Sequence, residues 1–266
     1  MADFGVELSY YWLPLLGFVV GLLATMVGGN GAFFFPPALI LLFQVSPRIA
    51  ITTSLAAVIP IGLIGSIEHY RRENINLPVG IIFGVAGLLG AFSGAWLSNR
   101  LTPDTLVMSF GIYAILLGLF TIRLPGGTSE ESNAPPLRFA DMRGRYLLPV
   151  LLIGLVSGFA AGLYGTSGTA PVLAGLFMLH LPVLQVIGTS VLIVFINALS
   201  GFSGHLLLGE FDWELVFLLG SGAALGAFTG PRLLGKIKPR GKGRNYRYVL
   251  SILLIILGVY LVSRFL

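Results

Sequence analysis

Residues 28–37 have the sequence GGNGAFFFPP and lie between two apolar stretches of the chain. Glycine loses more backbone freedom on folding than other residues, and proline removes a hydrogen-bond donor, so a continuous helix through this segment is unfavourable. A second interruption, YGTSG, occupies residues 164–168 between two further apolar stretches. These two breaks decide the fold, because backbone freed from a helix is tolerated inside a membrane only where it is buried in protein or lines a cavity.

The composition indicates a membrane protein. Of 266 residues 56% are apolar and only 10% are charged, and the mean hydropathy is +0.92, whereas a soluble domain carries roughly a quarter charged residues. Several apolar runs approach the ~20 residues that cross a bilayer. The absence of Cys excludes thiol chemistry and Cys-ligated metals. Residues 1–9 contain no Lys or Arg, so we expect the first helix to be retained rather than cleaved as a signal peptide.

The two halves of the chain are related by a repeat. At an offset of roughly 136 residues the chain matches itself along much of its length, as internal repeats do. The matched pairs include Gly28 with Gly165, Gly31 with Gly168, and His69 with His205. We therefore predict two membrane repeats, residues 10–123 and 146–265. They are joined by residues 124–145, which are rich in Gly, Pro, Ser and charge and are typical of an exposed linker.

Each repeat is predicted to be a broken or re-entrant helix pair followed by three transmembrane helices, about eight to ten membrane segments in all. The predicted segments of the first repeat are 10–27, 33–44, 48–69, 76–100 and 103–123. Those of the second are 146–163, 169–180, 183–207, 212–236 and 246–265. The second segment of each repeat is too short to span unaided, which favours a half-helix. The predicted fold class is an all-α polytopic membrane protein.

The basic residues predict that the repeats are inverted. Arg71 and Arg72 follow the third segment of the first repeat, whereas the corresponding loop, LGEFD at 208–212, has two acids and no base. We assign loops 70–75, 124–145 and 236–247, with the adjoining helix ends, to the cytoplasm. With this assignment 13 of the 16 Lys and Arg residues are cytoplasmic, and only Arg48, Arg100 and Arg264 lie on the external side. The distribution follows the positive-inside rule. We expect a multi-pass protein of the cytoplasmic membrane with both termini outside.

Inverted repeats with broken helices at matching positions indicate a transporter whose substrate binds near the membrane midplane, by alternating access. The N-terminus of a half-helix presents free N–H groups and a partial positive charge, which suit an anion. Each break is followed by a short apolar helix, so two such N-termini are predicted to face one another across a pseudo-twofold axis. The expected partners are a small anionic substrate and the lipid bilayer, with no nucleic acid, and a homodimer is left open.

Neutral polar side chains fall where such a pocket needs donors. The candidate substrate-binding residues are Gly28, Gly29, Asn30, Gly31, Thr53, Ser54, Gly165, Thr166, Ser167, Gly168, Thr189, Ser190 and Asn197. Asn197 follows Ser190 by seven residues and so shares a helix face with it. No charged residue falls at the centre of a predicted helix, so the candidates for gating or coupling lie at helix ends: Glu68, His69, Arg71 and His205.

Other functions are consistent with parts of the sequence. GTSG at 165–168 has the form of the nucleophile motif of rhomboid intramembrane proteases, with Ser167 as nucleophile and His205 as base. The repeat argues against this enzyme, because Ser167 falls on Asn30 and His205 on His69. A non-transporting membrane scaffold would not need two equivalent breaks. A nickel or cobalt permease is disfavoured, because no His and Asp have the helical spacing of metal ligands. We expect neither enzymatic activity, a cofactor nor a metal.

Three stretches resemble the sulfite exporter TauE/SafE family, also called the TSUP transporters: GLLATMVGGNGAFFFPPALILLF at 21–43, ITTSLAAV at 51–58 and HYRRENINL at 69–77. With a weaker second copy, the resemblance covers nearly the whole chain. It implies a transporter that moves sulfite or organosulfur anions such as sulfonates across the cytoplasmic membrane. It also implies that five glycines match the family's break motif: Gly28, Gly29, Gly31, Gly165 and Gly168. The chain departs from that motif at Asn30 and at the Thr166-Ser167 pair.

Overall fold

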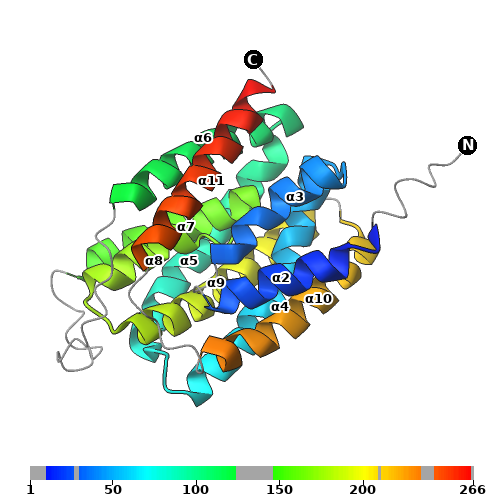
Figure 1. Cartoon of the computed structure of the whole chain (residues 1–266). Helices are drawn as coiled ribbons and strands as arrows, with labels where there is room; N and C mark the ends of the chain where they lie inside the picture. Colours follow the sequence, from blue (N-terminus) through cyan, green and yellow to red (C-terminus); the bar gives the residue numbers. More distant parts are fainter. Residues whose placement is uncertain (1–9, 27–29, 124–145, 209–210, 235–242, 265–266) are drawn as a thin grey trace, which may run out of the picture.

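The structure, a computed structural model, describes residues 10–26, 30–123, 146–208, 211–234 and 243–264, and these residues are almost entirely helical, with short turns between the helices (Figure 1). The first repeat contributes α2 (Leu13–Met26), the 3₁₀ helix η1 (Asn30–Phe34), α3 (Phe35–Leu42), α4 (Pro47–Arg71), α5 (Leu77–Arg100) and α6 (Pro103–Arg123). The second contributes α7 (Leu147–Tyr164), α8 (Thr169–Met178), α9 (Val183–Leu208), α10 (Trp213–Leu234) and α11 (Gly243–Ser263). These ranges contain no strand, so the predicted all-α fold is confirmed, with helix boundaries within a few residues of the predicted ones.

The helices have the length and the outer surface of membrane spans. Six of those described are long and apolar enough to cross a bilayer, and shorter apolar helices such as α2 and α8 accompany them. Large apolar side chains are exposed on several helices, including Leu89 on α5, Leu116 on α6 and Phe217 on α10. Such an exterior is favourable in lipid and unfavourable in water. The chain is therefore a multi-pass membrane protein. The predicted linker at 124–145 lies outside the described residues, and its cytoplasmic location stays a prediction.

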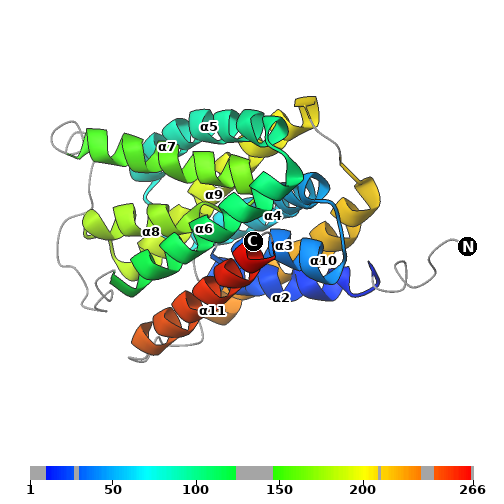
Figure 2. The same cartoon turned by 90° about the horizontal axis from the view of Figure 1, so that it is seen from above.

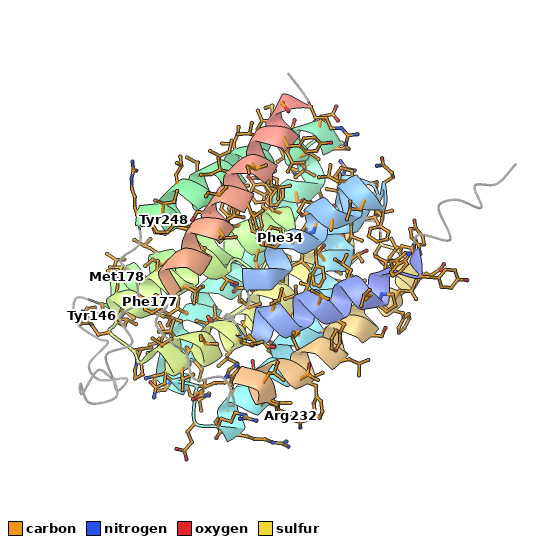
Figure 3. All side chains as sticks on the ribbon, in the orientation of Figure 1. Phe34, Tyr146, Phe177, Met178, Arg232 and Tyr248 are labelled. Carbon is orange, nitrogen blue, oxygen red and sulfur yellow. The ribbon has the colours of Figure 1, made fainter. Side chains whose placement is uncertain are left out.

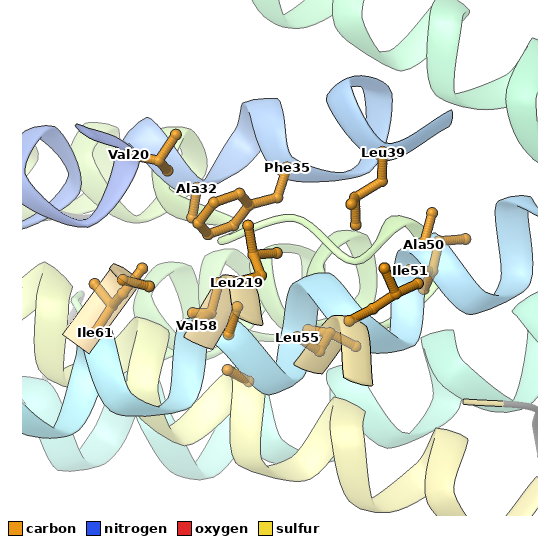
Figure 4. Close-up of a cluster of buried hydrophobic side chains, with 14 of the residues drawn as sticks. Val20, Ala32, Phe35, Leu39, Ala50, Ile51, Leu55, Val58, Ile61 and Leu219 are labelled. Atoms are coloured by element: carbon orange, nitrogen blue, oxygen red, sulfur yellow. The ribbon is translucent and has the colours of Figure 1, made fainter. Parts of the chain in front are cut away.

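The centre of the bundle is formed by α4 and α9 (Figure 2). All residues from 50 to 58 of α4 are buried, which requires neighbours on every side of the helix. Val20 of α2, Phe35 and Leu39 of α3, and Leu219 of α10 pack in the cluster around it (Figure 4). Since α10 comes from the second repeat, the core joins the two repeats.

Glycines along α7 allow this helix to approach α5 closely. A Cβ on Gly158 would overlap the carbonyl oxygen of Gly87, so the two backbones touch as small residues permit in membrane helices. The order of the facing residues gives the directions: Gly154 faces Phe83, Gly158 faces Gly87, and Gly162 faces Ala91. The two helices are therefore parallel.

Corresponding helices of the two repeats are antiparallel. Gly62 of α4 faces Phe195 of α9, while Gly65, further along α4, faces Val191, earlier in α9. The α6 and α11 pair shows the same reversal, with facing pairs Gly111 with Gly258 and Gly118 with Ser251. Because α9 is the counterpart of α4, and α11 that of α6, the helices of the two repeats run in opposite directions, as the charge pattern predicts.

The repeats are interlocked. The first helix of each packs along the fourth helix of the other: α2 along α10, and α7 along α5. In the first of these pairs Gly222 faces Pro14 and Gly226 faces Phe18, so α2 and α10 are also parallel. Any rocking of one part of the bundle against another must therefore move helices from both repeats.

Candidate functional site

The second break is a tight turn between α7 and α8. Gly165 and Gly168 have φ angles of +69° and +58°, a left-handed conformation that glycine adopts without steric penalty. A side chain would also lack space there. A Cβ on Gly165 would lie 2.7 Å from the Cα of Ile51, and one on Gly168 would lie 2.8 Å from the hydroxyl oxygen of Ser157. The turn therefore places the start of α8 beside α7.

A buried chain of hydrogen bonds connects this turn to α9. The side-chain nitrogen Nδ2 of Asn197 donates to the Ser157 hydroxyl at 3.2 Å, and that hydroxyl donates to the Gly168 carbonyl oxygen at 2.7 Å. Asn197 and Ser157 are both fully buried. A Cβ on Gly87 of α5 would overlap the amide oxygen Oδ1 of Asn197, so a glycine there makes room for the asparagine.

The start of α8 is left uncapped by side chains. Gly168 is its N-cap residue and offers no side-chain hydrogen bond, so the first N–H groups of the helix are not satisfied in that way. Two polar atoms in this region are buried and have no hydrogen-bond partner: the Thr169 hydroxyl oxygen and Oδ1 of Asn197. A helix N-terminus beside an unpaired hydroxyl can donate hydrogen bonds to an anion, which the helix dipole also stabilises.

Ser157, Thr169 and Asn197 form a cluster that we call the polar centre. The first repeat does not reproduce it. The counterparts of Ser157, Thr169 and Asn197 are the buried apolar residues Val20, Ala32 and Ile61. Gly28 and Gly29 lie outside the described residues, and Asn30 and Gly31 begin η1. Among the described residues, the side chains of the polar centre all come from the second repeat. The first repeat contributes Gly87 of α5, which leaves space for Asn197. The prediction of two facing half-helix N-termini stays a prediction, because residues 27–29 of the first break lie outside the described residues.

The two Thr-Ser pairs chosen from the sequence lie far apart. Thr53 and Ser54 precede Gly62 on α4, and Thr189 precedes Phe195 on α9. Because α4 and α9 are antiparallel where Gly62 meets Phe195, the pairs lie on opposite sides of the centre, roughly 20 Å apart at 1.5 Å per residue.

Most of these hydroxyls already have hydrogen-bond partners within the protein. The hydroxyl of Thr189 accepts from the backbone N–H of Asn76 at 2.9 Å, and that of Ser54 donates to Ala50 at 2.6 Å. Ser190 donates to the carbonyl oxygen of Ile187, within its own helix, at 2.8 Å. Thr53 is buried and its hydroxyl has no partner. The structure therefore does not bring these two pairs into one pocket with Asn197.

Thr166 and Ser167 are buried within the second break. The Thr166 hydroxyl lies 3.5 Å from the carbonyl oxygen of Ala160, in the preceding helix. Ser167 does not form the proposed protease dyad: the ring nitrogens of His205 are bonded instead to the Gly162 carbonyl oxygen, at 2.8 Å, and to Nδ2 of Asn99, at 3.4 Å. In this structure His205 is thus not bonded to Ser167 as the base of a catalytic dyad would be.

The two histidines hold equivalent places in the two repeats. Nε2 of His69 lies 3.1 Å from the carbonyl oxygen of Thr25, near the end of α2, just as His205 contacts Gly162 near the end of α7. Both carbonyls belong to the last turn of a helix before a break, where carbonyl groups lack intrahelical partners. Each histidine thus joins the third helix of its repeat to the end of the broken one.

Aromatic rings on α6 lie between the two breaks. Phe33 in η1 lies 5.1 Å from Phe110, and Tyr164, which precedes Gly165, lies 5.5 Å from the same ring and 5.1 Å from Tyr113, as ring-centroid distances. The segments that flank the two breaks thus meet on one helix.

Neither this aromatic cluster nor the polar pair of Ser157 and Thr169 was predicted from the sequence. The cluster carries no local signal, because aromatic residues are common throughout so apolar a chain. Ser157 could have been found, since it is the only serine or threonine within α7.

A family model described as "Sulfite exporter TauE/SafE" matches residues 13–261 of the chain. The chain belongs to this family. It is similar to YunE of Bacillus subtilis, at 26% identity over 96% of this chain and 98% of that protein. It is also similar to YdhB of the same organism, at 27% identity over 82% and 87% of the two chains, and to a protein of Methanocaldococcus jannaschii, at 25% over 94% and 95%. All three relatives are named probable membrane transporter proteins.

As a member of the TauE/SafE family, the protein is a membrane transporter, and the resemblance stated from its sequence is confirmed. Its buried acidic and histidine side chains, within the described residues, are Glu68, His69 and His205, and all three lie near the ends of α4 and α9. The polar centre at α8 therefore consists of neutral groups and a helix dipole.

Proposed function

We propose that the protein carries a small sulfur-containing anion, sulfite or a sulfonate, across the cytoplasmic membrane by alternating access, with both termini outside. The observation that carries the proposal is the uncapped N-terminus of α8, where the Thr169 hydroxyl is buried without a partner. The family description, a sulfite exporter, supports the choice of anion.

Neutral donors suit a transported anion. A helix N-terminus stabilises a negative charge by about 0.3–2 kcal/mol, and hydrogen bonds to charged groups add about 1.5–3 kcal/mol each. A buried Arg at the same place would bind the anion strongly and slow its release. The centre of this protein thus offers binding that is favourable but reversible, as transport requires.

The antiparallel arrangement of α4 with α9 supports alternating access. In a bundle with inverted halves, a small rocking motion opens one side while it closes the other. The start of α8, which is tied to α9 through Ser157 and Asn197, would then face the two sides in turn.

The test is transport by the purified chain in liposomes. We expect uptake of labelled sulfite, with competition from unlabelled sulfite and taurine, measured with and without a pH gradient. Thr169→Val keeps the shape of the side chain but removes the hydroxyl. It should raise the KM of the transported anion about tenfold, the loss expected for one hydrogen bond to a charged group.

Ser203→Ala is the matched control. Ser203 is an exposed residue on α9 whose hydroxyl donates to the Leu199 carbonyl oxygen of its own turn, so its loss should leave KM unchanged. If no sulfite, thiosulfate, sulfate or taurine is transported, the proposed substrate is wrong. If transport occurs and Thr169→Val behaves like Ser203→Ala, the proposed site is wrong.

A further inference from the structure

The ends of three helices meet at the edge of the bundle where α4 enters the turn to α5. His69 of α4 contacts the Thr25 carbonyl oxygen of α2 at 3.1 Å, and Gly230 of α10 lies against the Thr25 side chain. Arg232, labelled at the end of α10 in Figure 3, forms an ion pair with Glu68 of α4 at 3.3 Å. This junction lies directly before the first break.

The ion pair of Glu68 with Arg232 joins the two repeats. The Glu68 side chain is only 9% exposed, so its carboxylate is mostly shielded from solvent. Arg71 also reaches this carboxylate, at 3.8 Å, but it lies one turn along the same helix. Within the described residues, only the pair with Arg232 connects charged groups of different repeats.

The opposite side of the bundle has no such pair at the equivalent place. The counterparts of Glu68 and Arg232 are Gly204 and Trp96, neither of which is charged. A Cβ on Gly204 would lie 2.8 Å from the Cβ of Ala95, so α5 and α9 are in close van der Waals contact there. Among the described residues, the repeats are therefore joined by an ion pair at the Glu68 end, whereas at the other end the equivalent positions are uncharged and the contact of Asn99 with His205 is between neutral side chains.

We propose that Glu68 and Arg232 form a gate latch that holds this end of the transporter closed. The inference rests on the alternating-access part of the proposed function. Opening this end must separate α4 from α10, which breaks the ion pair, whereas opening the other end leaves it intact. The latch thus favours the conformation that is closed at the Glu68 end. Within it, Arg232 binds Glu68 of the other repeat and does not bind the substrate.

Accessibility of a single cysteine tests the latch without any substrate. The chain contains no Cys, so one introduced thiol reports alone. Ser66 is 7% exposed and its hydroxyl has no hydrogen-bond partner, so Ser66→Cys loses no bond. We expect slow labelling of this thiol by a membrane-impermeant methanethiosulfonate reagent applied to vesicles from the Glu68 side. Arg232→Gln and Glu68→Gln should each raise the labelling rate about fivefold, as expected for loss of one partly exposed ion pair.

Arg71→Gln is the matched control, since it removes a cation from the same carboxylate but breaks no contact between repeats; its labelling rate should stay near that of the parent. The double variant of Glu68→Gln with Arg232→Gln should label no faster than either single variant, because both remove one interaction. Arg232→Lys, which keeps the charge, should retain slow labelling.

Equal effects of Arg71→Gln and Arg232→Gln, or no effect of Arg232→Gln, would overturn the latch. Two controls show that unfolding does not cause the change in labelling. All variants should label equally after denaturation, and each should elute from a size-exclusion column at the volume of the native protein. Because no anion is present in the assay, failure of the latch and failure of the proposed substrate are separate results.

Discussion

The hydroxyl of Ser157 donates to the carbonyl oxygen of Gly168 at 2.7 Å, which ties α7 to the residue that begins α8. The same hydroxyl accepts from Asn197 at 3.2 Å, so one oxygen atom connects α7, α8 and α9. Both residues are buried, where hydrogen bonds are stronger and unpaired groups are costly. The Ser157 side chain therefore helps to hold the α8 N-terminus in place, together with the turn at Gly165 and Gly168.

Ser157→Ala should reduce both stability and transport. It leaves the Gly168 carbonyl and the Asn197 amide without this partner, at a cost of about 1–3 kcal/mol for a buried polar group. We expect a lower free energy of unfolding in detergent and a higher KM in liposomes. Ser93→Ala on α5 removes an exposed hydroxyl that bonds within its own helix and should change neither quantity. A KM that stays at the wild-type value would show that the α8 N-terminus does not need Ser157.

Gly87→Ala should displace Asn197. Its new methyl group would overlap Oδ1 of Asn197, which is held in place by Ser157, so the amide must rotate away from the hydroxyl. Gly84→Ala, one turn earlier on the same helix, meets the flexible end of Ile196 and should be accommodated by a rotamer change. We expect a loss of transport for the first variant only, at similar expression. Equal transport by both variants would mean that Asn197 has no role at the site.

Gly168→Ala should destabilise the break. The left-handed conformation costs an L-residue about 1–2 kcal/mol, and the methyl group would also overlap the Ser157 carbonyl oxygen. Gly220→Ala is the comparison, since a Cβ at this position in α10 would have no atom within 4 Å. That change should be neutral or stabilise by up to about 1 kcal/mol, because Ala favours a helix. Thermal unfolding in detergent measures both, and similar midpoints would contradict the strained turn.

Most of the helices could be predicted from the sequence, because membrane spans follow from runs of apolar residues. Residues 103–123 and α6 coincide, and the short apolar segment at 169–180 became α8. The interlocking of α2 with α10 could not be predicted, because Gly222 and Gly226 indicate a close approach of some backbone but do not identify Pro14 and Phe18 as the residues that they face. The local sequence indicates that a helix has a face for close packing, but it does not indicate which helix packs against that face.

The candidate site in the structure includes only some of the residues chosen from the sequence, and inverted symmetry explains why. Aligning the repeats pairs Thr53 with Thr189 and suggests that both serve one pocket. In an inverted repeat, however, equivalent residues lie on opposite sides of the centre unless they are close to the symmetry axis. Asn197 lies two residues beyond Phe195, where α4 and α9 cross, and it does belong to the polar centre. Distance from the crossing point, rather than sequence equivalence, decides which residues meet.

His205 provides a last test, because its ring links α9 to the end of α7. A carbonyl oxygen can only accept, so Nε2 carries the hydrogen in its 2.8 Å contact with Gly162. His205→Leu would leave this buried carbonyl unpaired and should lower the free energy of unfolding by about 1–3 kcal/mol. His205→Gln retains an N–H donor and should lose less.

The corresponding changes at His69 should follow the same order, because that ring contacts the Thr25 carbonyl oxygen in the same manner at 3.1 Å. Each histidine could stabilise its helix ends through the hydrogen bond or through packing of the ring. The free energy of unfolding in detergent, measured for all four variants at one pH, distinguishes these two explanations. If the hydrogen bond matters, Gln exceeds Leu in stability at both positions. If packing of the ring matters instead, Gln and Leu are equally destabilising, and the histidines do not act by holding the helix ends at the breaks.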